Sequence, residues 1–424
     1  MKILLLAQHY APEDVSGAVL ATELATDLAS QGHTVTFVTC APNYPLGKVF
    51  SGYRNRFLQS ETVDGVRVVR TWSYISTTKS FWKRLFNYGT WSATAFWGGI
   101  WSGKPDVIFS YSPPLPLGLS AWLLSRLWRV PWVLRIEDLY PDAAIAAGVM
   151  HNSAAIHFFG WLERFLYRRA DHISLISEVF RRNLLAKSVS PSKLSVTPVW
   201  ADPDVVRPLP KDNSFRRQYG LDGAFVVMYA GGLGHTTALG DVLDTAALLQ
   251  DMPRPNSSTP PVRFVIVGEG VKKETLMQDA RQRRLDNVLF LPFQPRERFA
   301  EMLAAADASL VTLNAQSSSF SLPSKTFNIM ASGRPILAIT PPDSEIAVLV
   351  TSGQCGVNLP LGQPRQVAAV IRDWQSDHAR LQQMGQNGRS MMESQFSRDR
   401  CIASFGQLLA HTVHGRNRPA VSQA

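Results

Sequence analysis

A lysine at the start of a predicted helix is the residue of this chain best placed to bind an anion. The segment 322–338 (LPSKTFNIMASGRPILA) predicts a helix that begins beside Pro323, which has no N–H to leave unpaired, and ends at Gly333, where a positive φ is needed. The free N–H groups at a helix start carry about half a positive charge, and Lys325 adds a full one. A cation at this position is unfavourable unless an anion is present. Lys325 and Ser324 are therefore candidate phosphate ligands, with a solvated lysine and a simple helix cap as the alternatives.

A second anion-binding turn is predicted upstream in the same half of the chain. The apolar run 225–230 breaks into a turn that contains Gly231, Gly232 and Gly234, and a helical pattern resumes over 237–250. Glycine lets the backbone approach a diphosphate that a side chain would block. Two such helix starts indicate a diphosphate ligand, although this turn is also compatible with an ordinary connection between a strand and a helix.

Length and composition predict a globular protein of two domains. The 424 residues exceed one usual hydrophobic core, and 45% are hydrophobic against 18% charged. Cys40, Cys355 and Cys401 lie far apart, so neither a disulfide framework nor a zinc site is expected, and a cytoplasmic location follows. The apolar run at the N-terminus is too short for a signal peptide. No carboxylates occur at metal-binding spacing, so no metal or other cofactor is predicted.

The positive charge is concentrated beside aromatic sequence. The net charge is +10, which favours nucleic acid, anionic lipid or phosphorylated substrates as partners. Nine of the eleven tryptophans lie between residues 72 and 161, and the uncharged stretch 85–103 directly follows Lys83 and Arg84. This composition is typical of a membrane-facing surface. Polar residues within 85–103 favour a helix at the interface or in the core over one that spans the bilayer. No nucleic-acid-binding module is recognised, so nucleic acid is not an expected partner.

Short apolar runs alternate with helical periods, which is the pattern of doubly wound parallel sheets. The first series predicts strands at 3–7, 34–39, 66–70, 106–110, 132–136 and 172–176, with helices at 17–31, 115–128, 154–169 and 178–187. The second predicts strands at 225–229, 263–267, 288–291, 309–313 and 335–339. A proline-rich connection near 198–210 separates the two series. The sequence therefore predicts an α/β protein with two similar domains, and a disordered tail after about His414.

The order of the motifs resembles that of family 4 glycosyltransferases, which have the GT-B fold. In the second half the motifs are GGLG (231–234), VIVGEG (265–270), VLFLPFQP (288–295), AAD (305–307), LPSK (322–325) and GRP (333–335). In the first half they are QHYAP (8–12), Gly17, GHTV (32–35) and RIEDLYPD (135–142). The resemblance extends from Met1 to about Leu409. It is strongest to the branch that includes colanic acid pathway transferases and fucosyl or N-acetylfucosaminyl transferases.

The resemblance implies two Rossmann-like domains with parallel sheets, facing each other across a cleft. Residues 1–200 would form an acceptor-binding domain with membrane-facing helices, and residues 201–398 a nucleotide-sugar-binding domain. Residues 399–424 would form a helix that returns to the N-terminal domain, followed by the disordered tail.

The resemblance also assigns donor-binding residues beyond the two helix starts. Gly268 and Gly270 end a strand at its carboxyl edge, where open α/β sheets bind ligands. Phe293 and Gln294 would lie beside the nucleobase and offer a stacking face and backbone hydrogen bonds. A plain tight turn at the glycines and core packing of Phe293 are the alternatives.

The donor site departs from the family pattern in its ribose contacts. Many relatives carry two glutamates eight residues apart, and this chain has Phe320 and Asn328 at those positions. Asn328 can still hydrogen-bond a ribose or sugar hydroxyl, whereas Phe320 cannot replace a carboxylate. Glu345 is an alternative ligand for the ribose or the sugar.

Acceptor residues are predicted at the end of strand 132–136. Glu137, Asp138 and Asp142 replace a histidine that is common in this region of the family, and Asp138 can orient or deprotonate the acceptor hydroxyl. The alternative is that these acids cap the following turn. At the edge of the first strand, His9 is assigned to the acceptor and Gly17 to the donor diphosphate.

The expected reaction is the transfer of a glycosyl group from a nucleoside diphosphate sugar to a lipid-linked saccharide, with retention of configuration. A fucose-type sugar is one candidate, and the product would be an exopolysaccharide or surface polysaccharide. Lys325 and backbone N–H groups would stabilise the departing diphosphate, which takes the acceptor proton. A lipid acceptor would explain the tryptophan-rich face as a surface that docks on anionic lipid at the inner face of the plasma membrane.

Three other functions are weighed against this reaction. A nucleotide-sugar epimerase of related fold would not need the tryptophan-rich surface. A non-catalytic scaffold would bind nucleotide sugar at a membrane without turnover. A nicotinamide-dependent dehydrogenase is disfavoured because the segment 7–12 after the first strand lacks the required glycines.

Overall fold

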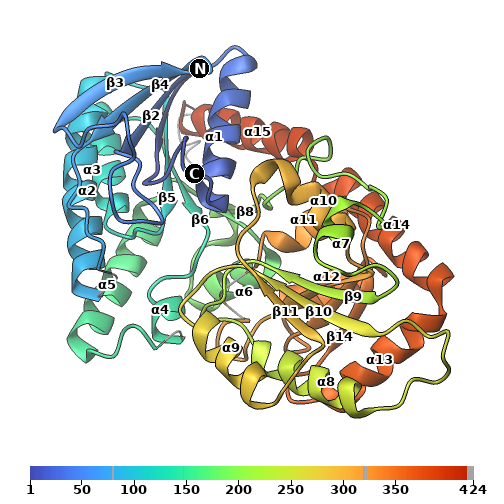
Figure 1. Ribbon diagram of the computed structural model, residues 1–424. Coiled ribbons are helices and arrows are strands. Elements are labelled where there is room, and N and C mark those ends of the chain that lie inside the picture. Colours follow the sequence, from blue (N-terminus) through green and yellow to red (C-terminus); the bar gives the residue numbers. More distant parts are fainter. Residues whose placement is uncertain (79–80, 147, 319, 321, 418–424) are drawn as a thin grey trace. The chain divides into compact units, whose positions relative to one another are not determined.

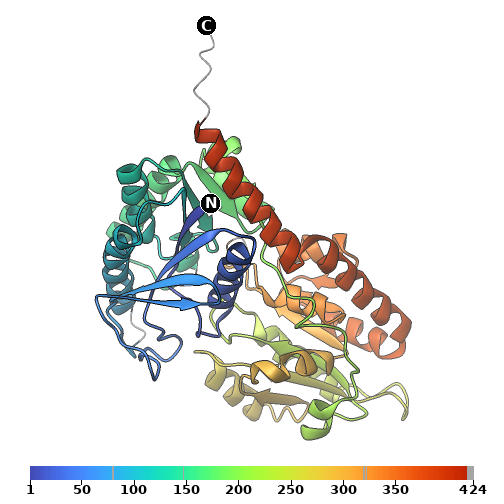
Figure 2. The ribbon, with the colours of Figure 1, turned by 90° about the horizontal axis from the view of Figure 1, so that it is seen from above.

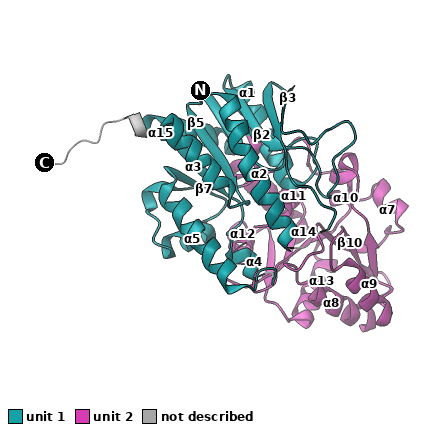
Figure 3. Cartoon of the chain, turned by 90° about the vertical axis from the view of Figure 1, so that its left-hand side faces the viewer, with its two compact units in different colours: residues 1–198, 399–424 teal, residues 199–398 magenta. Residues whose placement is uncertain are grey.

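The computed structural model describes residues 1–78, 81–146, 148–318, 320 and 322–417 (Figure 1). The chain divides into two compact units (Figure 3). The first unit comprises residues 1–198 together with 399–424, and the second comprises residues 199–398. Each unit is built on a sheet of its own.

The sheet of the first unit has the strand order β3-β4-β2-β1-β5-β6-β7-β8. Its strands are β1 (Lys2–Leu6), β2 (Thr34–Cys40), β3 (Leu58–Val63), β4 (Val66–Thr71), β5 (Val107–Ser112), β6 (Trp132–Ile136), β7 (His172–Leu175) and β8 (Leu194–Val196). Only β3 pairs antiparallel, with β4. Every position of β5 and β6 is buried, as expected for parallel strands covered on both faces.

Helices cover both faces of this sheet. They are α1 (Ser16–Ser30), α2 (Phe81–Ser102), α3 (Leu117–Trp128), α4 (Asp142–Ala146), α5 (Ser153–Arg169), α6 (Glu178–Ala186) and α15 (Arg398–Asn417), with a short 3₁₀ helix, η1 (Pro191–Lys193). Helices α2, α3 and α5 lie side by side on one face (Figures 1 and 3). Right-handed crossovers that all step the same way across the sheet explain this layer. Small residues allow the close packing, since a Cβ at Gly99 or Gly118 would overlap a leucine of the neighbouring helix.

Helices α1 and α15 lie on the opposite face of the first sheet (Figure 2). The ring of Phe405 in α15 lies 5.8 Å from the ring of Phe109 in β5. The Arg135 guanidinium lies 5.0 Å from the centre of the Phe405 ring and stacks on it. Helix α15 continues to Asn417, so the expected disorder just after His414 is wrong for residues 415–417. The remainder of the predicted tail lies outside the described residues.

The sheet of the second unit is parallel throughout, with the order β11-β10-β9-β12-β13-β14. Its strands are β9 (Phe225–Ala230), β10 (Val262–Val267), β11 (Val288–Leu291), β12 (Ala308–Thr312), β13 (Ile336–Ile339) and β14 (Gly356–Leu359). Its helices are α7 (Ser214–Gln218), α8 (Leu239–Asp251), α9 (Lys273–Gln282), η2 (Arg296–Arg298), α10 (Phe299–Ala304), α11 (Lys325–Ala331), α12 (Glu345–Ser352), α13 (Pro364–Ser376) and α14 (His378–Gln395).

The predicted strands of both series and the four predicted helices of the first half are confirmed. The strands β3, β8 and β14 were not predicted, because β3 is polar and the short segments LSV of β8 and GVNL of β14 are not continuous apolar runs. The uncharged stretch 85–103 lies almost entirely in α2. Among the residues that the structure describes, no helix, α2 included, is long and apolar enough to cross a membrane.

A buried ion pair ties the start of the second unit to its sheet. The Arg216 guanidinium donates to Asp307 Oδ2 at 2.5 Å and to the carbonyl oxygens of Ala305 and Ala224. Asp307 also accepts from the Val226 N–H at 2.8 Å. Both side chains of the pair are almost fully buried. The aspartate of the AAD motif therefore has a structural role.

We expect Asp307→Ala to lower the free energy of unfolding by about 3–5 kcal/mol, because it leaves the Arg216 guanidinium buried without its counter-charge. Urea unfolding followed by circular dichroism measures the change. The control is Asp212→Ala, whose carboxylate lies 3.9 Å from Arg216 with its side chain 75% exposed, and which should change stability by less than about 0.5 kcal/mol. Equal stabilities of the two variants would contradict the role of the buried pair.

Candidate functional site

Two turns at the carboxyl edge of the second sheet pack directly on each other. The turn after β9 and the turn after β10 exchange backbone hydrogen bonds, from the Leu233 N–H to Glu269 O at 2.9 Å and from the Lys272 N–H to Leu233 O at 3.0 Å. A Cβ at Gly268 would overlap the carbonyl oxygen of Gly231, and one at Gly270 would overlap that of Leu233. The structure therefore gives Gly268 and Gly270 a packing role, while their contact with a donor stays a prediction.

Lys325 lies against the first of these turns. Its Nζ donates to Tyr229 Oη at 2.6 Å and lies 3.8 Å from the centre of the Tyr229 ring. A Cβ at Gly231 would overlap Lys325 Nζ and lie 2.7 Å from its Cε, and the φ of Gly231 is +152°. Burial lowers the pKa of Lys325 to about 7. The structure thus brings together Lys325 and the glycine turn, and adds Tyr229.

The backbone donors expected at the two helix starts are only partly available. At the start of α11 the Thr326 N–H donates to Pro323 O at 3.0 Å and the Phe327 N–H donates to Ser324 O at 3.1 Å. The side chain of Ser324 makes no cap to α11, so the simple helix cap is wrong. Helix α8 begins at Leu239, two residues later than predicted. Gly232 and Gly234 face open space, which leaves room for a ligand at the turn.

The other predicted donor residues follow different strands of the same sheet. Phe293 comes two residues after β11 and is 56% exposed, so the alternative of core packing is wrong. The amide of Gln294 donates to Pro292 O at 3.0 Å. Asn328 lies one turn along α11 from Lys325 and is partly exposed. Glu345 is the first residue of α12, whose N-cap is Ser344.

Two acids follow β6 in the first unit. A Cβ at Gly17 would lie 3.8 Å from Glu137 Oε2, so the structure places these two predicted residues side by side. Burial raises the pKa of Glu137, and the nearby Arg135 opposes the shift. Asp138 keeps an exposed surface, yet the atoms crowded around its carboxyl and the charge of Glu137 raise its pKa to about 7. Burial raises the pKa of Tyr88 of α2, and the charge of Asp138 adds a smaller effect in the same direction. Sequence reasoning missed Tyr88 because the mostly uncharged, tryptophan-rich sequence of α2 indicated a membrane-facing surface and no site residue.

A buried glutamate fixes His9 at the end of β1. His9 Nδ1 lies 2.7 Å from Glu13 Oε2, and Glu13 Oε1 accepts from the backbone N–H groups of Asn43 and Tyr44 at 2.7 Å each. The His9 and Tyr44 rings are 5.2 Å apart. Glu13 thereby orients the histidine, which no motif indicated.

Asp142 has a structural partner. Lys187 Nζ lies 2.7 Å from Asp142 Oδ2 and 2.6 Å from Glu163 Oε1, and the Tyr167 hydroxyl donates to Glu163 at 2.9 Å. Asp142 is the first residue of α4, which fits the alternative that this acid stabilises a helix start. Its role in binding the acceptor stays a prediction. Within the described ranges, no three His, Cys, Asp or Glu side chains come close enough together to hold a metal ion.

Family models match both halves of the chain. Residues 17–200 match a glycosyl transferase 4-like domain, and residues 211–391 match the glycosyl transferases group 1. A colanic acid biosynthesis glycosyl transferase of Escherichia coli K12, WcaI, is 29% identical over 351 residues, which cover 78% of this chain and 82% of that protein. The chain is a family 4 glycosyltransferase.

Other proteins are similar to this transferase in sequence or in fold. A glycosyltransferase of Pseudomonas aeruginosa, WbjE, is 25% identical over 69% of the chain and 72% of its own length. Sucrose-phosphate synthase from Thermosynechococcus elongatus superposes with a TM-score of 0.75 at 18% identity, over 98% of this chain and 100% of that one. HepE of Anabaena, solved with UDP-glucose, has a TM-score of 0.67 at 16% identity, over 98% of this chain and 100% of HepE. The transferase has the GT-B fold.

We expect Gly232→Ala to weaken the binding of UDP or GDP at least tenfold without changing the melting temperature, because the new methyl group enters space that the protein leaves open but a diphosphate would occupy. Isothermal titration calorimetry measures the affinity. Gly89→Ala in α2 of the first unit also adds a methyl group in open space and should bind as the wild type does. Unchanged affinity in Gly232→Ala would exclude this turn as the diphosphate site.

Proposed function

We propose that the transferase moves a sugar from a nucleoside diphosphate sugar to a hydroxyl of a lipid-linked saccharide, with retention of configuration, in the synthesis of an exopolysaccharide or surface polysaccharide. The observation that carries the proposal is the placement of Lys325 against the Gly231–Gly234 turn with a tyrosine hydroxyl as its hydrogen-bond partner. The structures of HepE with UDP-glucose and of WaaG, a glycosyltransferase involved in lipopolysaccharide biosynthesis, support it. The colanic acid role of WcaI supports the polysaccharide product, and a fucose-type sugar is a candidate donor.

On the donor side, Lys325 would stabilise the departing diphosphate. Breaking the bond between the sugar and the phosphate leaves an additional negative charge on the diphosphate oxygen. A cation held beside that oxygen lowers the barrier, since it is already in place when the charge develops. Phe293, exposed after β11, offers a face for the base, and Asn328 offers an amide for a ribose or sugar hydroxyl. The departing phosphate then takes the acceptor proton, and we propose that no metal is needed.

On the acceptor side, Glu137, Asp138 and His9 would bind the saccharide. Because the pKa of Asp138 is raised to about 7, a large fraction of its carboxyl is ionised at neutral pH and can accept a hydrogen bond that orients the acceptor hydroxyl. His9 presents a ring held by Glu13. Tyr88 adds a hydroxyl near Asp138.

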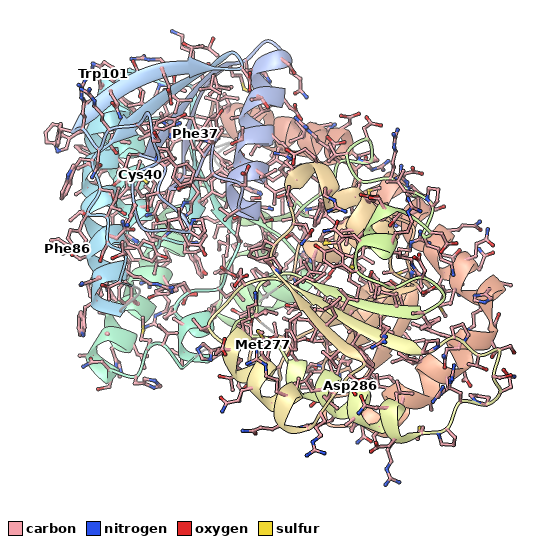
Figure 4. All side chains as sticks on the ribbon, in the orientation of Figure 1. Phe37, Cys40, Phe86, Trp101, Met277 and Asp286 are labelled. Carbon is pink, nitrogen blue, oxygen red and sulfur yellow. The ribbon has the colours of Figure 1, made fainter. Side chains whose placement is uncertain are left out.

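The outer face of α2, α3 and α5 would dock on the membrane. Its exposed large apolar side chains are Trp82, Phe86, Trp97, Trp101, Leu123, Leu127, Phe158 and Trp161. Figure 4 labels Phe86 and Trp101 on the outer side of α2. The exposed charged residues of these helices are all cations: Lys83, Arg84, Arg126, Arg164, Arg168 and Arg169. The sole acid in the three helices, Glu163, is buried and paired with Lys187. An apolar face with one sign of charge fits an anionic bilayer, at the inner face of the plasma membrane.

A binding panel followed by a transfer assay tests the proposed function. Melting temperatures with UDP, GDP and their sugars identify the donor base, because a ligand that binds only the folded state raises the apparent stability. Labelled sugar should then enter the organic phase only when a lipid-linked saccharide is supplied, and EDTA should not change the rate. Consumption of the nucleotide sugar without an acceptor would indicate an epimerase, and binding without turnover would indicate a scaffold; either result overturns the proposal.

We expect the kcat/KM of transfer to be bell-shaped, with its maximum near pH 7. Asp138 must be ionised to act, which requires a pH above about 7, and Lys325 must be protonated, which requires a pH below about 7. Asp138→Asn should lower the rate and remove the acid limb of the profile. Asp14→Asn replaces another exposed aspartate of the first unit and should keep the wild-type profile. An acid limb that persists in Asp138→Asn would exclude Asp138 as its source.

We expect the whole chain to co-sediment with vesicles that contain phosphatidylglycerol and to bind less as salt rises. A triple variant, Trp82→Ser with Phe86→Ser and Trp97→Ser, removes three aromatic anchors and should reduce binding at least tenfold. The matched control is Met252→Ser with Val271→Ser and Val348→Ser, which removes three exposed apolar residues of the second unit. Equal binding by the two triple variants would contradict a docking surface on α2.

A further inference from the structure

In the part of the chain that the structure describes, one side chain binds the ammonium of Lys325. Its Nζ donates to Tyr229 Oη at 2.6 Å and lies over the Tyr229 ring at 3.8 Å from the centre. Tyr229 is fully buried near the end of β9, and its hydroxyl donates to the carbonyl oxygen of Gly232 at 2.8 Å. The tyrosine therefore connects the lysine to the glycine turn through one hydroxyl group.

The surroundings of Lys325 offer its charge little other compensation. An ammonium has three N–H donors, and among the described residues only the bond to Tyr229 uses one of them. The lysine also borders a cavity of about 10 Å³ whose lining is mainly apolar: Met228, Ala230, Phe299, Leu303, Ser309 and Ile329. Among the described charged groups near α11, Arg389 of α14 binds Ala331 O at the far end of the helix. Within the described ranges, the ammonium therefore has one hydrogen-bond acceptor and no ion-pair partner.

We propose that Tyr229 is the residue that positions Lys325 for the donor, by holding its ammonium against the Gly231–Gly234 turn before a diphosphate binds there. The inference rests on the proposed donor site. The tyrosine ring attracts the cation and its hydroxyl accepts one N–H, which together replace part of the lost hydration. A leucine or phenylalanine in the same strand position could fill the core but could not accept this hydrogen bond. The hydroxyl of Tyr229 is therefore the group that the lysine requires at this position.

The same contacts predict that the donor binds together with a proton. Burial lowers the pKa of Lys325 to about 7 in the free protein, so above this pH the amine is largely neutral. A bound diphosphate favours the charged form and raises that pKa. Donor affinity should therefore fall as the pH rises from 6 to 8. A nucleoside diphosphate sugar is the suitable probe, because its phosphodiester groups do not titrate in this range.

A double-mutant cycle tests the positioning role. The variants are Tyr229→Phe, Lys325→Met and the double variant, and calorimetry measures the affinity of the whole chain for UDP-glucose and GDP-fucose. Tyr229→Phe should weaken binding about tenfold or more, as expected for the loss of a hydrogen bond to a charged group. In the Lys325→Met background the same change should have no further effect, because the tyrosine acts through the lysine.

The pH profile gives a readout that a purely structural role would not alter. The affinity of Lys325→Met should not vary between pH 6 and 8. In Tyr229→Phe the inflection should move to lower pH, since the charged form of the lysine loses its acceptor. A flat wild-type profile would contradict the proposal.

Several results would overturn the inference. If Tyr229→Phe weakens binding equally in both backgrounds, the tyrosine acts through the fold. If Tyr229→Phe binds the nucleotide sugar as the wild type does while Lys325→Met loses affinity, the positioning role is wrong and the proposed donor site stands. If neither variant loses affinity, the donor binds elsewhere and both proposals fail.

Discussion

The contact between the Lys325 ammonium and the Tyr229 phenol is the interaction on which the proposed donor site of this transferase depends. Burying a cation without a counter-charge costs free energy, and the fold sustains it because α11 is anchored at its other end and the tyrosine is enclosed in β9. Glycine at 231 leaves the space that the ammonium occupies. The second glycine turn packs on the first, which fixes both. A diphosphate would relieve the cost, so the same feature that destabilises the free protein favours the bound one.

In the first unit the candidate site groups are acids. Glu137 and Asp138 follow a fully buried strand, and burial raises the pKa of each, to about 7 for Asp138. Glu13 and Glu163, by contrast, are engaged by backbone N–H groups or by Lys187 and stabilise local structure. Acids with partners thus shape this unit, while Asp138 keeps an exposed surface for an acceptor. The second unit thus contains a buried lysine whose pKa is lowered, and the first contains an aspartate whose pKa is raised. Such a pair suits a reaction that moves a glycosyl group between two oxygens.

Sequence patterns predicted most of the fold and part of the site. Apolar runs of four to six residues marked the buried strands, because such strands show little polar alternation when both faces are covered. The helix-start chemistry around Pro323 singled out Lys325. The partner Tyr229 could not be predicted, because it lies 96 residues away and meets the lysine only through the packing of α11 on the sheet. In the same way, nothing in the sequence linked Asp142 to Lys187, 45 residues later. Local signals predict elements and charges, whereas contacts between distant side chains require the assembled sheet.

Helix α2 connects the two proposed roles of the first unit, membrane docking and acceptor binding. One turn near its start carries Phe86, which is exposed, followed by Asn87 and Tyr88, which are partly buried. Asn87 accepts from the Gln8 amide at 2.6 Å and donates to Ser73 Oγ at 2.9 Å, so its turn is fixed to the end of β1, where His9 follows. Tyr88 lies within electrostatic reach of Asp138. The proposed lipid-linked acceptor would present its sugar to the acids while its hydrocarbon remains in the bilayer. A helix with exposed aromatic residues on one side and polar residues on the other would meet this requirement within a single turn, because its successive residues point in different directions.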